Sequence, residues 1–430
     1  MYKVVDLFCG AGGMSEGILQ AGFHIAFSSD INEDVEKTYR NRHEQLGYKQ
    51  GIDTYFYRSD IRELTGELIL EKINSLPVYK NSSDVIDVVF GGPPCQGFSR
   101  AGRRKADDPR NLLFKEYIRV VSELNPRYVV MENVVGFVDM KFYDFTGLDG
   151  EKYTDGSVTP DILENELTKL GYKSKYKILN AADYGVPQRR NRIIFLAYKK
   201  GEKEPNFPKK LGITLTVEEA ISDLISDSNT KEIFSQSEYQ KKSIDGRTPT
   251  KNGTPIKSVE ILNNEKSTHT DIIVERFSLF KTGETGTDVR KRIKEEGLDL
   301  SKTPKLMDLM IEKTGLTDRE INEKMKTNVD DNLLDILLTK KNMRVRFDGN
   351  QPSATVVTIA DDYISPFENR TFTVRELARL QSFDDSFEFL GKRTTGGLRR
   401  RVEVPQYTQV GNAVPPLLAK AIASEIIKCL

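Results

Sequence analysis

The sequence predicts an α/β protein built on a doubly wound, mostly parallel sheet with an inserted smaller domain. In the first 200 residues, short unbroken apolar runs alternate with helical patterns. Because helices cover both faces of a parallel sheet, its strands read as continuous apolar runs. The expected strands are Lys3–Phe8, His24–Ser28, Ile86–Phe90, Tyr128–Met131, Lys173–Leu179 and Arg192–Ala197, and the expected helices cover residues 14–21, 111–124 and 161–170.

A change of pattern near residue 203 predicts the inserted domain. Prolines and polar stretches such as 226–258 break the alternation, and Lys305–Lys326 reads as helix, turn, helix. Within it, Thr317 and Glu320 have the spacing of a capping box. Strong helical patterns return at Val374–Gln381 and Pro416–Leu430. We therefore expect a first domain of residues 1–202 completed by 406–430, an inserted domain of 203–370, and a hinge segment of 371–405.

Composition excludes several classes of protein. The 64 Lys and Arg balance the 64 Asp and Glu, so net charge neither supports nor excludes nucleic acid, because basic patches can be local. Three cysteines without CxxC or Cys/His spacing argue against a disulfide framework and a metal site. No apolar run approaches the roughly 18 residues of a membrane span, and no signal peptide is evident, so a cytoplasmic protein is expected.

A glycine turn follows the first strand in DLFCGAGG. Such a turn is the usual place where a parallel sheet approaches a nucleotide-like ligand. Ser15 occupies the place of a third dinucleotide-motif glycine, and the turn is not a P-loop, which disfavours pyrophosphate and triphosphate ligands, including a nicotinamide cofactor. Asp30 ends the second strand, and Asp60 is placed to end a third. These acids suit the hydroxyls of an adenosyl group, although a purely structural turn remains the alternative.

The fourth strand runs into GGPPCQGFSRAG. Pro93 and Pro94 restrict the backbone where a parallel strand ends, which holds Cys95 at the edge where sites form. A thiolate there can act as a nucleophile. The alternative is a small buried hydrophobic residue, which is the usual state of a lone cysteine. The Gly- and Arg-rich segment Gln96–Arg110 that follows suits closure on a polyanion.

Three more side chains are predicted at the same edge. Glu132 follows the strand Tyr128–Met131, where a carboxyl group can donate or accept a proton; helix capping is the alternative. Arg190 and Arg192 are two residues apart before an apolar strand, so period two places them on one face. Guanidinium groups there suit a base carbonyl or a phosphate, with a surface strand edge as the alternative.

Taken together, these residues resemble the cytosine-5 DNA methyltransferase family, in the form found in bacterial restriction-modification systems. The motifs DLFCGAGG, SSDIN, RSDI, GGPPCQGFS, DPRNLLF, MENVVG, QRRNR, RELARLQSFDDSFEF and QVGNAVPPLLA occur in the family's order and cover about residues 1–200 and 344–430. The resemblance implies the fold of S-adenosylmethionine-dependent methyltransferases. It also implies that 203–370 recognises the target sequence, and that the chain transfers a methyl group to carbon 5 of a flipped-out cytosine.

The resemblance also implies the site. Cys95, Glu132, Arg190 and Arg192 are expected to carry the chemistry without a metal, the two arginines holding the base carbonyl and the cysteine loop. S-adenosylmethionine is the expected cofactor, with the last motif completing its pocket. The expected contacts are Phe8, Gly10, Gly13, Asp30, Asp60, Ile61, Pro94, Leu113, Asn412 and Val414.

The expected partner is double-stranded DNA, bound by a monomer that is functionally paired with a restriction endonuclease. Two rival functions remain: a tRNA cytosine-5 methyltransferase of the same family and a catalytically silent DNA-binding regulator. The role of the helical segment 302–343 is also open. It either presents Arg319, Asn322 and Lys326 to a DNA groove or forms a packing subdomain.

Overall fold

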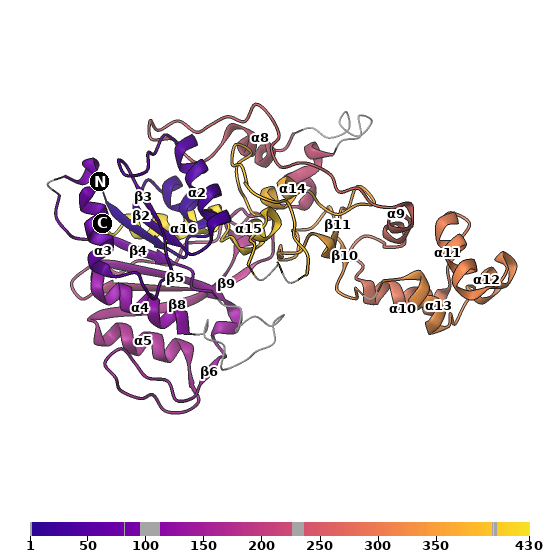
Figure 1. Ribbon diagram of the computed structural model, residues 1–430, viewed down its shortest axis with the longest axis horizontal. Helices are drawn as coiled ribbons and strands as arrows, with labels where there is room; N and C mark the ends of the chain where they lie inside the picture. The colour runs from indigo at the N-terminus through magenta and orange to yellow at the C-terminus, as the bar shows by residue number, and fades with distance from the viewer. Residues whose placement is uncertain are drawn as a thin grey trace.

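A computed structural model describes residues 2–80, 82–94, 112–225, 236–339, 341–397, 399 and 402–430. Its centre is a seven-stranded sheet of order β3-β2-β1-β4-β5-β9-β8 (Figure 1). Neighbouring strands are parallel except where β9 pairs with β5 and with β8. The predicted doubly wound, mostly parallel sheet is confirmed. The strands are β1 (Lys3–Leu7), β2 (His24–Asp30), β3 (Tyr55–Arg58), β4 (Val88–Gly91), β5 (Tyr128–Val134), β8 (Tyr172–Asn180) and β9 (Asn191–Lys199).

Helices cover both faces of this sheet, as the unbroken apolar strands require. On one face, α3 (Gly66–Ser75), α4 (Leu113–Leu124) and α5 (Thr159–Lys169) pack on side chains such as Val5 and Val89. On the other, α1 (Gly13–Gln20) and α16 (Pro416–Ile427) pack on Val4 and Val88. The C-terminal helix therefore lies beside the first helix of the chain, on the same layer (Figure 1).

Parts of the expected pattern need correction, among them α3, a helix that the sequence pattern did not predict. The third strand, β3, ends at Arg58, so Asp60 lies in the loop that follows rather than at the strand end. The helix α2 (Glu33–Gln45) was not predicted, because its buried face includes Arg42 and His43 where an apolar stripe is the usual signal. Arg42 is buried because it donates two hydrogen bonds to the buried carboxylate of Glu16, each 2.9 Å long.

The middle of the chain forms two further hydrophobic clusters. One joins α6 (Val217–Ile221) and α8 (Glu238–Asp245) to α14 (Val374–Leu380) and α15 (Gln406–Asn412). The other belongs to a helical lobe that lies apart from the sheet in Figure 1. The lobe contains α9 (Asp271–Ser278), α10 (Gly286–Glu296), α11 (Pro304–Thr314), α12 (Asp318–Lys324) and α13 (Asp331–Leu337). Two of its helices, α11 and α12, confirm the helix–turn–helix expectation, and the predicted capping box of Thr317 and Glu320 begins the second of them. Two short strand pairs complete the fold: β10 (Val345–Arg346) with β11 (Tyr363–Ile364), and β6 (Lys141–Phe142) with β7 (Ser157–Val158).

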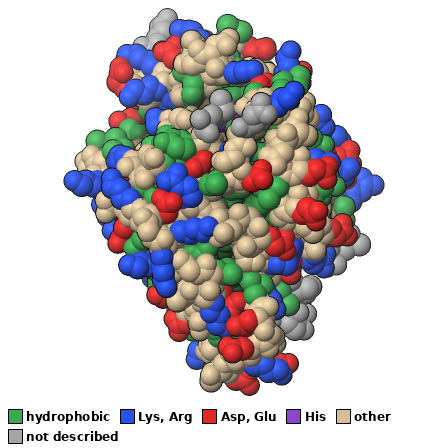
Figure 2. Space-filling model, turned by 90° about the vertical axis from the view of Figure 1, so that its left-hand side faces the viewer, with side chains coloured by type: hydrophobic (Ala, Val, Ile, Leu, Met, Phe, Trp, Pro, Cys, Tyr) green, Lys and Arg blue, Asp and Glu red, His purple; other side chains and the backbone are tan. Residues whose placement is uncertain are grey.

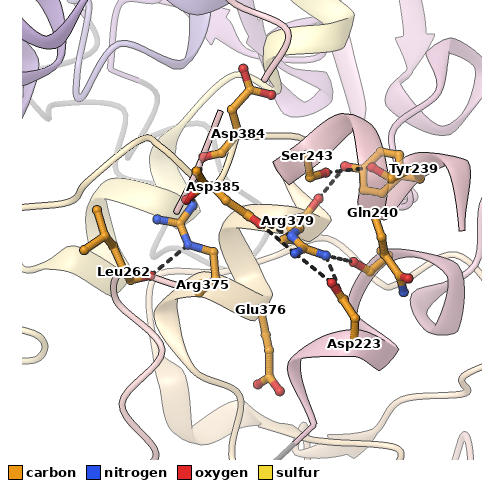
Figure 3. Close-up of polar contacts among 12 residues, drawn as sticks. Asp223, Tyr239, Gln240, Ser243, Leu262, Arg375, Glu376, Arg379, Asp384 and Asp385 are labelled. Carbon is orange, nitrogen blue, oxygen red and sulfur yellow. Dashed lines mark hydrogen bonds and ion pairs between the residues drawn. The ribbon is translucent and has the colours of Figure 1, made fainter. Parts of the chain in front are cut away.

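Buried arginines of α14 fix the segments around it. Arg379 makes ion pairs of 2.8 Å with Asp223 and 2.6 Å with Asp385, and Arg375 donates to the carbonyl oxygens of Leu262 and Asp384 (Figure 3). Buried charges are tolerated when they are paired and hydrogen-bonded in this way. This helix therefore ties the inserted segment to the C-terminal part of the chain.

The outer surface mixes both signs of charge. On the face drawn in Figure 2, Lys and Arg side chains alternate with Asp and Glu side chains, in keeping with the zero net charge of the sequence. Within the described ranges, no helix has the length and apolar character needed to cross a membrane.

The contact between α1 and α16 leaves no room for side chains. A Cβ atom added to Gly17 would lie 2.4 Å from the carbonyl oxygen of Pro416 and 2.5 Å from the Cβ of Ala419. We therefore expect Gly17→Ala to lower the free energy of unfolding by about 1–3 kcal/mol, through overpacking. Urea unfolding would measure the loss. The control is Gly396→Ala, where an added Cβ meets nothing within 4 Å. Equal stability of both variants would contradict the tight contact.

Candidate active site

The predicted acid and one predicted arginine meet at the carboxyl edge of the sheet. Glu132 lies near the end of β5, and Arg192 lies near the start of the antiparallel neighbour β9. The Nε of Arg192 lies 2.7 Å from Oε1 of Glu132, and each side chain is 12% exposed. This pair fixes the orientation of the carboxylate while both groups stay within reach of a ligand.

The turn after β4 lies directly beside this pair. A Cβ added to Gly92 would lie 3.4 Å from Oε2 of Glu132, so no side chain separates the turn from the acid. Asn133 is buried, and its Nδ2 donates a 3.2 Å hydrogen bond to the carbonyl oxygen of Pro93. Pro94 is half-buried, and Cys95, which follows it in the chain, lies outside the described residues.

The glycine turn after β1 forms an open cradle. Phe8, Gly10 and Gly12 all have positive φ, of 56°, 55° and 101°, which bends the chain sharply at the end of the strand. The backbone N–H of Gly10 donates a 3.1 Å hydrogen bond to Oδ2 of Asp30. Nothing lies within 4 Å of a Cβ built on Gly10. Burial raises the pKa of the Asp30 carboxyl, which a hydrogen-bonding ligand could partner.

The other residues predicted to surround the glycine turn come from separate segments of the chain. A Cβ added to Gly13 would lie 2.4 Å from the carbonyl oxygen of Val414, so the C-terminal segment adjoins the glycine turn. Ile61 is buried, and its carbonyl oxygen accepts from Arg119 of α4. Asp60 pairs with Arg62, whose hydrogen bond lowers the pKa of Asp60. The remaining side chains are half-buried or exposed: Phe8, Leu113 and Asn412.

Arg190 has a different environment from Arg192. It is 2% exposed, and it donates hydrogen bonds of 3.1 Å to the carbonyl oxygen of Val356 and 3.0 Å to that of Gly411. Arg190 lies just before β9, and the structure does not bring it into the ion pair that Arg192 makes with Glu132. Its contacts come from segments far along the chain, which spacing alone does not reveal.

One buried acid beside the site was not predicted from the sequence. Asp6 of β1 is 1% exposed, and it accepts a 2.5 Å hydrogen bond from Ser15 of α1. Its Oδ1 atom is buried without a hydrogen-bond partner among the described residues. Burial raises the pKa of Asp6 to about 7. An acidic residue inside an otherwise apolar predicted strand, as in KVVDLF, is the signal that could have identified Asp6.

The helical lobe holds a cavity of about 570 Å³. Asn322 and Lys326 lie on its rim beside Asp299 and Asp318, and Arg319 is exposed. Lys326 forms a 2.6 Å ion pair with Glu323. Lys326, which one of the two interpretations of this segment presents to a DNA groove, is therefore already paired with an acidic side chain.

Comparisons with known proteins agree on one family. The family model described as "C-5 cytosine-specific DNA methylase" matches residues 2–428. Type II methyltransferase M1.HphI of Haemophilus parahaemolyticus is 34% identical over 99% of this chain and 86% of its own length. Type II methyltransferase M.DdeI of Desulfomicrobium norvegicum is 32% identical, over 99% of this chain and 88% of its own.

A solved structure has a similar fold. It is described as a DNA modification methyltransferase encoded within a prophage of E. coli. The TM-score is 0.64 at 23% identity, over 100% of this chain and 99% of that one. At this identity the likeness concerns the fold alone.

The raised pKa of Asp6 predicts a pH effect on stability. Its pKa rises from the model-compound value of 3.8 to about 7 on folding, so between these values the folded state binds a proton that the unfolded state lacks. The contribution of Asp6 to the free energy of unfolding therefore falls as pH rises from about 4 to about 7. Asn cannot ionise but still accepts from Ser15. We expect Asp6→Asn to gain stability relative to the wild type between pH 5 and pH 8.

Urea unfolding at both pH values measures this difference. Asp308→Asn serves as the control, because the Asp308 side chain is 68% exposed. The same difference between Asp6→Asn and the wild type at pH 5 and pH 8 would show that Asp6 does not titrate in this range.

Proposed function

Since the chain belongs to the C-5 cytosine-specific DNA methylase family, and is a DNA cytosine-5 methyltransferase of the restriction-modification type, we propose that Cys95, Glu132 and Arg192 carry its chemistry. The observation that carries this proposal is the 2.7 Å ion pair of Glu132 and Arg192 beside the Gly92–Pro94 turn. Chain connectivity puts Cys95 directly after Pro94. The nucleophile, the acid and a guanidinium group are thus assigned to one edge of the sheet.

The cradle around Gly10 suits S-adenosylmethionine as the methyl donor. The space beside Gly10 is open, and the buried carboxyl of Asp30 can accept hydrogen bonds from ribose hydroxyls. Phe8 and Ile61 offer apolar contacts for adenine, with Asp60 beside them. We assign the other contacts to Gly13, Pro94, Leu113, Asn412 and Val414. When bound, S-adenosylmethionine supplies an electrophilic methyl group.

Cys95 is assigned as the nucleophile. The target cytosine must leave the duplex, since its ring is otherwise covered by the stack. The Cys95 thiolate adds to ring carbon 6, which forms a carbon–sulfur bond and makes carbon 5 nucleophilic. After methyl transfer, a base takes the proton from carbon 5, and elimination releases the Cys95 thiolate. Burial raises the pKa of the thiols of both described cysteines, Cys9 and Cys429, which disfavours a thiolate at either.

Glu132 and Arg192 act on the base itself. In the protonated form, the Glu132 carboxyl donates its proton to ring nitrogen 3, and its other oxygen accepts a hydrogen bond from the exocyclic amine. The proton at nitrogen 3 stabilises the negative charge that develops on the ring as Cys95 adds to carbon 6. Arg192 holds the Glu132 carboxylate in place and donates to the base carbonyl. A planar guanidinium suits both tasks, because it presents several donors in a fixed geometry.

The remaining parts of the chain are assigned to DNA recognition. We assign residues 1–202 with 406–430 to catalysis, 203–370 to target recognition and 371–405 to a hinge. The substrate is a specific site in duplex DNA, bound by a monomer in the cytoplasm. A restriction endonuclease of the same specificity is its functional partner.

The most direct test is expression in a host that lacks cytosine methylation, followed by bisulfite sequencing. We expect methylation at carbon 5 of one cytosine in a fixed sequence. Cys95→Ala should lower the rate about a thousandfold or more, because the covalent step is lost. Glu132→Gln should lower it about a hundredfold or more, because it weakens stabilisation of the developing charge.

Cys429→Ala is the matched control and should methylate at the wild-type rate. Purified enzyme should be assayed on duplex DNA and on tRNA in parallel. Activity on tRNA alone would overturn the assignment of substrate. Undiminished methylation by Cys95→Ala would overturn the mechanism and leave a different nucleophile to be found.

A further inference from the structure

The last three residues of α15 and the two residues after them adjoin both the glycine turn and the chain that leads into β9. We call residues Val410–Val414 the C-terminal turn. On one side, the carbonyl oxygen of Val414 and the Cβ of Ala413 would lie 2.4 and 2.9 Å from a Cβ on Gly13 of the glycine turn. On the other side, two buried polar side chains, Gln381 and Arg190, hold its backbone.

Gln381 is the first of these side chains. It ends α14 and is 0% exposed. Its Nε2 donates hydrogen bonds of 2.8 Å to the carbonyl oxygen of Val410 and 3.4 Å to that of Ala413. Its Oε1 accepts a 2.9 Å hydrogen bond from Nε2 of Gln188. One amide group therefore spans the C-terminal turn and the chain that leads into β9.

Arg190 is the second. Its guanidinium bridges the carbonyl oxygens of Gly411 and Val356. Gln188, two residues earlier, also holds this neighbouring segment, because its Oε1 accepts a 2.9 Å hydrogen bond from the backbone N–H of Val356. The arginine motif that supplies Arg192 to the base thus also fastens the C-terminal turn.

Close packing around Gly411 also restricts movement of the C-terminal turn. A Cβ on Gly411 would lie 2.6 Å from the carbonyl carbon of Val357 and 2.8 Å from the N of Thr358. The C-terminal turn is therefore confined between the glycine turn and the segment after Val356. A shift of a few tenths of an ångström at Val410 or Ala413 must move Asn412 and Val414 as well.

We propose that Gln381 and Arg190 are positioning residues that hold the C-terminal turn at the distance from Gly13 at which the methyl-donor pocket is complete. The proposal rests on the pocket assigned above. Neither residue need contact the donor or the base. Removing one of these hydrogen bonds would leave a buried carbonyl oxygen of the C-terminal turn without a partner, which is costly. The two side chains therefore restrain the position of the turn.

The test compares two buried glutamines. Gln381→Met keeps the length of the side chain but removes its donors to the C-terminal turn. Gln240→Met is the matched control, because Gln240 is 1% exposed and donates to the carbonyl oxygen of Glu218 and the hydroxyl of Ser222, both outside this turn. For both variants, the dissociation constants for S-adenosylmethionine and for duplex DNA, the KM for donor and the kcat are measured, together with thermal unfolding.

We expect Gln381→Met to weaken donor binding about tenfold or more, and to raise the KM for donor by a similar factor. The kcat at saturating donor and the affinity for duplex DNA should stay within about threefold of wild type. Gln240→Met should lose comparable thermal stability without the change in donor affinity. If Gln381→Met does not fold, Gln381→Asn is used, since its shorter amide cannot span both Gln188 and the turn; it should weaken donor binding in the same direction.

Two results would overturn the proposal. The first is donor binding that is no weaker in Gln381→Met, or in Gln381→Asn where that variant replaces it, than in Gln240→Met. The second is an equal loss of affinity for the donor and for duplex DNA. Asp30→Ala separates this failure from failure of the proposed pocket. If Asp30→Ala weakens donor binding while Gln381→Met does not, the pocket stands and the positioning role falls. If neither variant weakens donor binding, the pocket itself is wrongly assigned.

Discussion

The proposed active site depends on the close packing of the two ends of the described chain. Gly13 and Gly17 of α1 face Val414, Pro416 and Ala419 with no room for a Cβ at either glycine. This contact puts the C-terminal segment against the glycine turn and beside the sheet. A cofactor pocket can then be built from residues about 400 positions apart, because α16 packs on the first helix of the chain.

The sheet contributes the reactive edge. Parallel strands end together, so the turns after β1 and β4 and the last residues of β5 share one side of the molecule. The antiparallel strand β9 begins at this same edge, which brings Arg192 to Glu132. One reversed strand therefore supplies a cation to an edge where the parallel strands supply an acid and the cysteine turn. The polar anchors Asn133, Gln188 and Arg190 fix the surrounding backbone.

The sequence predicted the parts of this site that depend on local rules. Strand ends placed Asp30 and Glu132 at the carboxyl edge, and the position of Arg192 before an apolar strand placed it near the same edge. It could not show that Arg190 binds the carbonyl oxygens of Val356 and Gly411, because those partners come from distant segments. The helix α2 was missed for a related reason: its buried Arg42 is satisfied by partners from elsewhere in the chain, Glu16 of another helix and Ser386. Tertiary pairing, and not periodicity, determines such residues.

The account makes Cys95 the covalent nucleophile at the edge formed by Glu132 and Arg192. Duplex DNA with 5-fluorocytosine at the methylated position tests this most directly, because a fluorine at carbon 5 cannot be removed as a proton and Cys95 cannot be released. With methyl donor present, we expect a protein–DNA complex that survives denaturation. Mass spectrometry of the digested complex should find the DNA attached to the peptide that contains Cys95. The absence of an adduct under conditions that methylate ordinary cytosine, or attachment at another residue, would contradict the account.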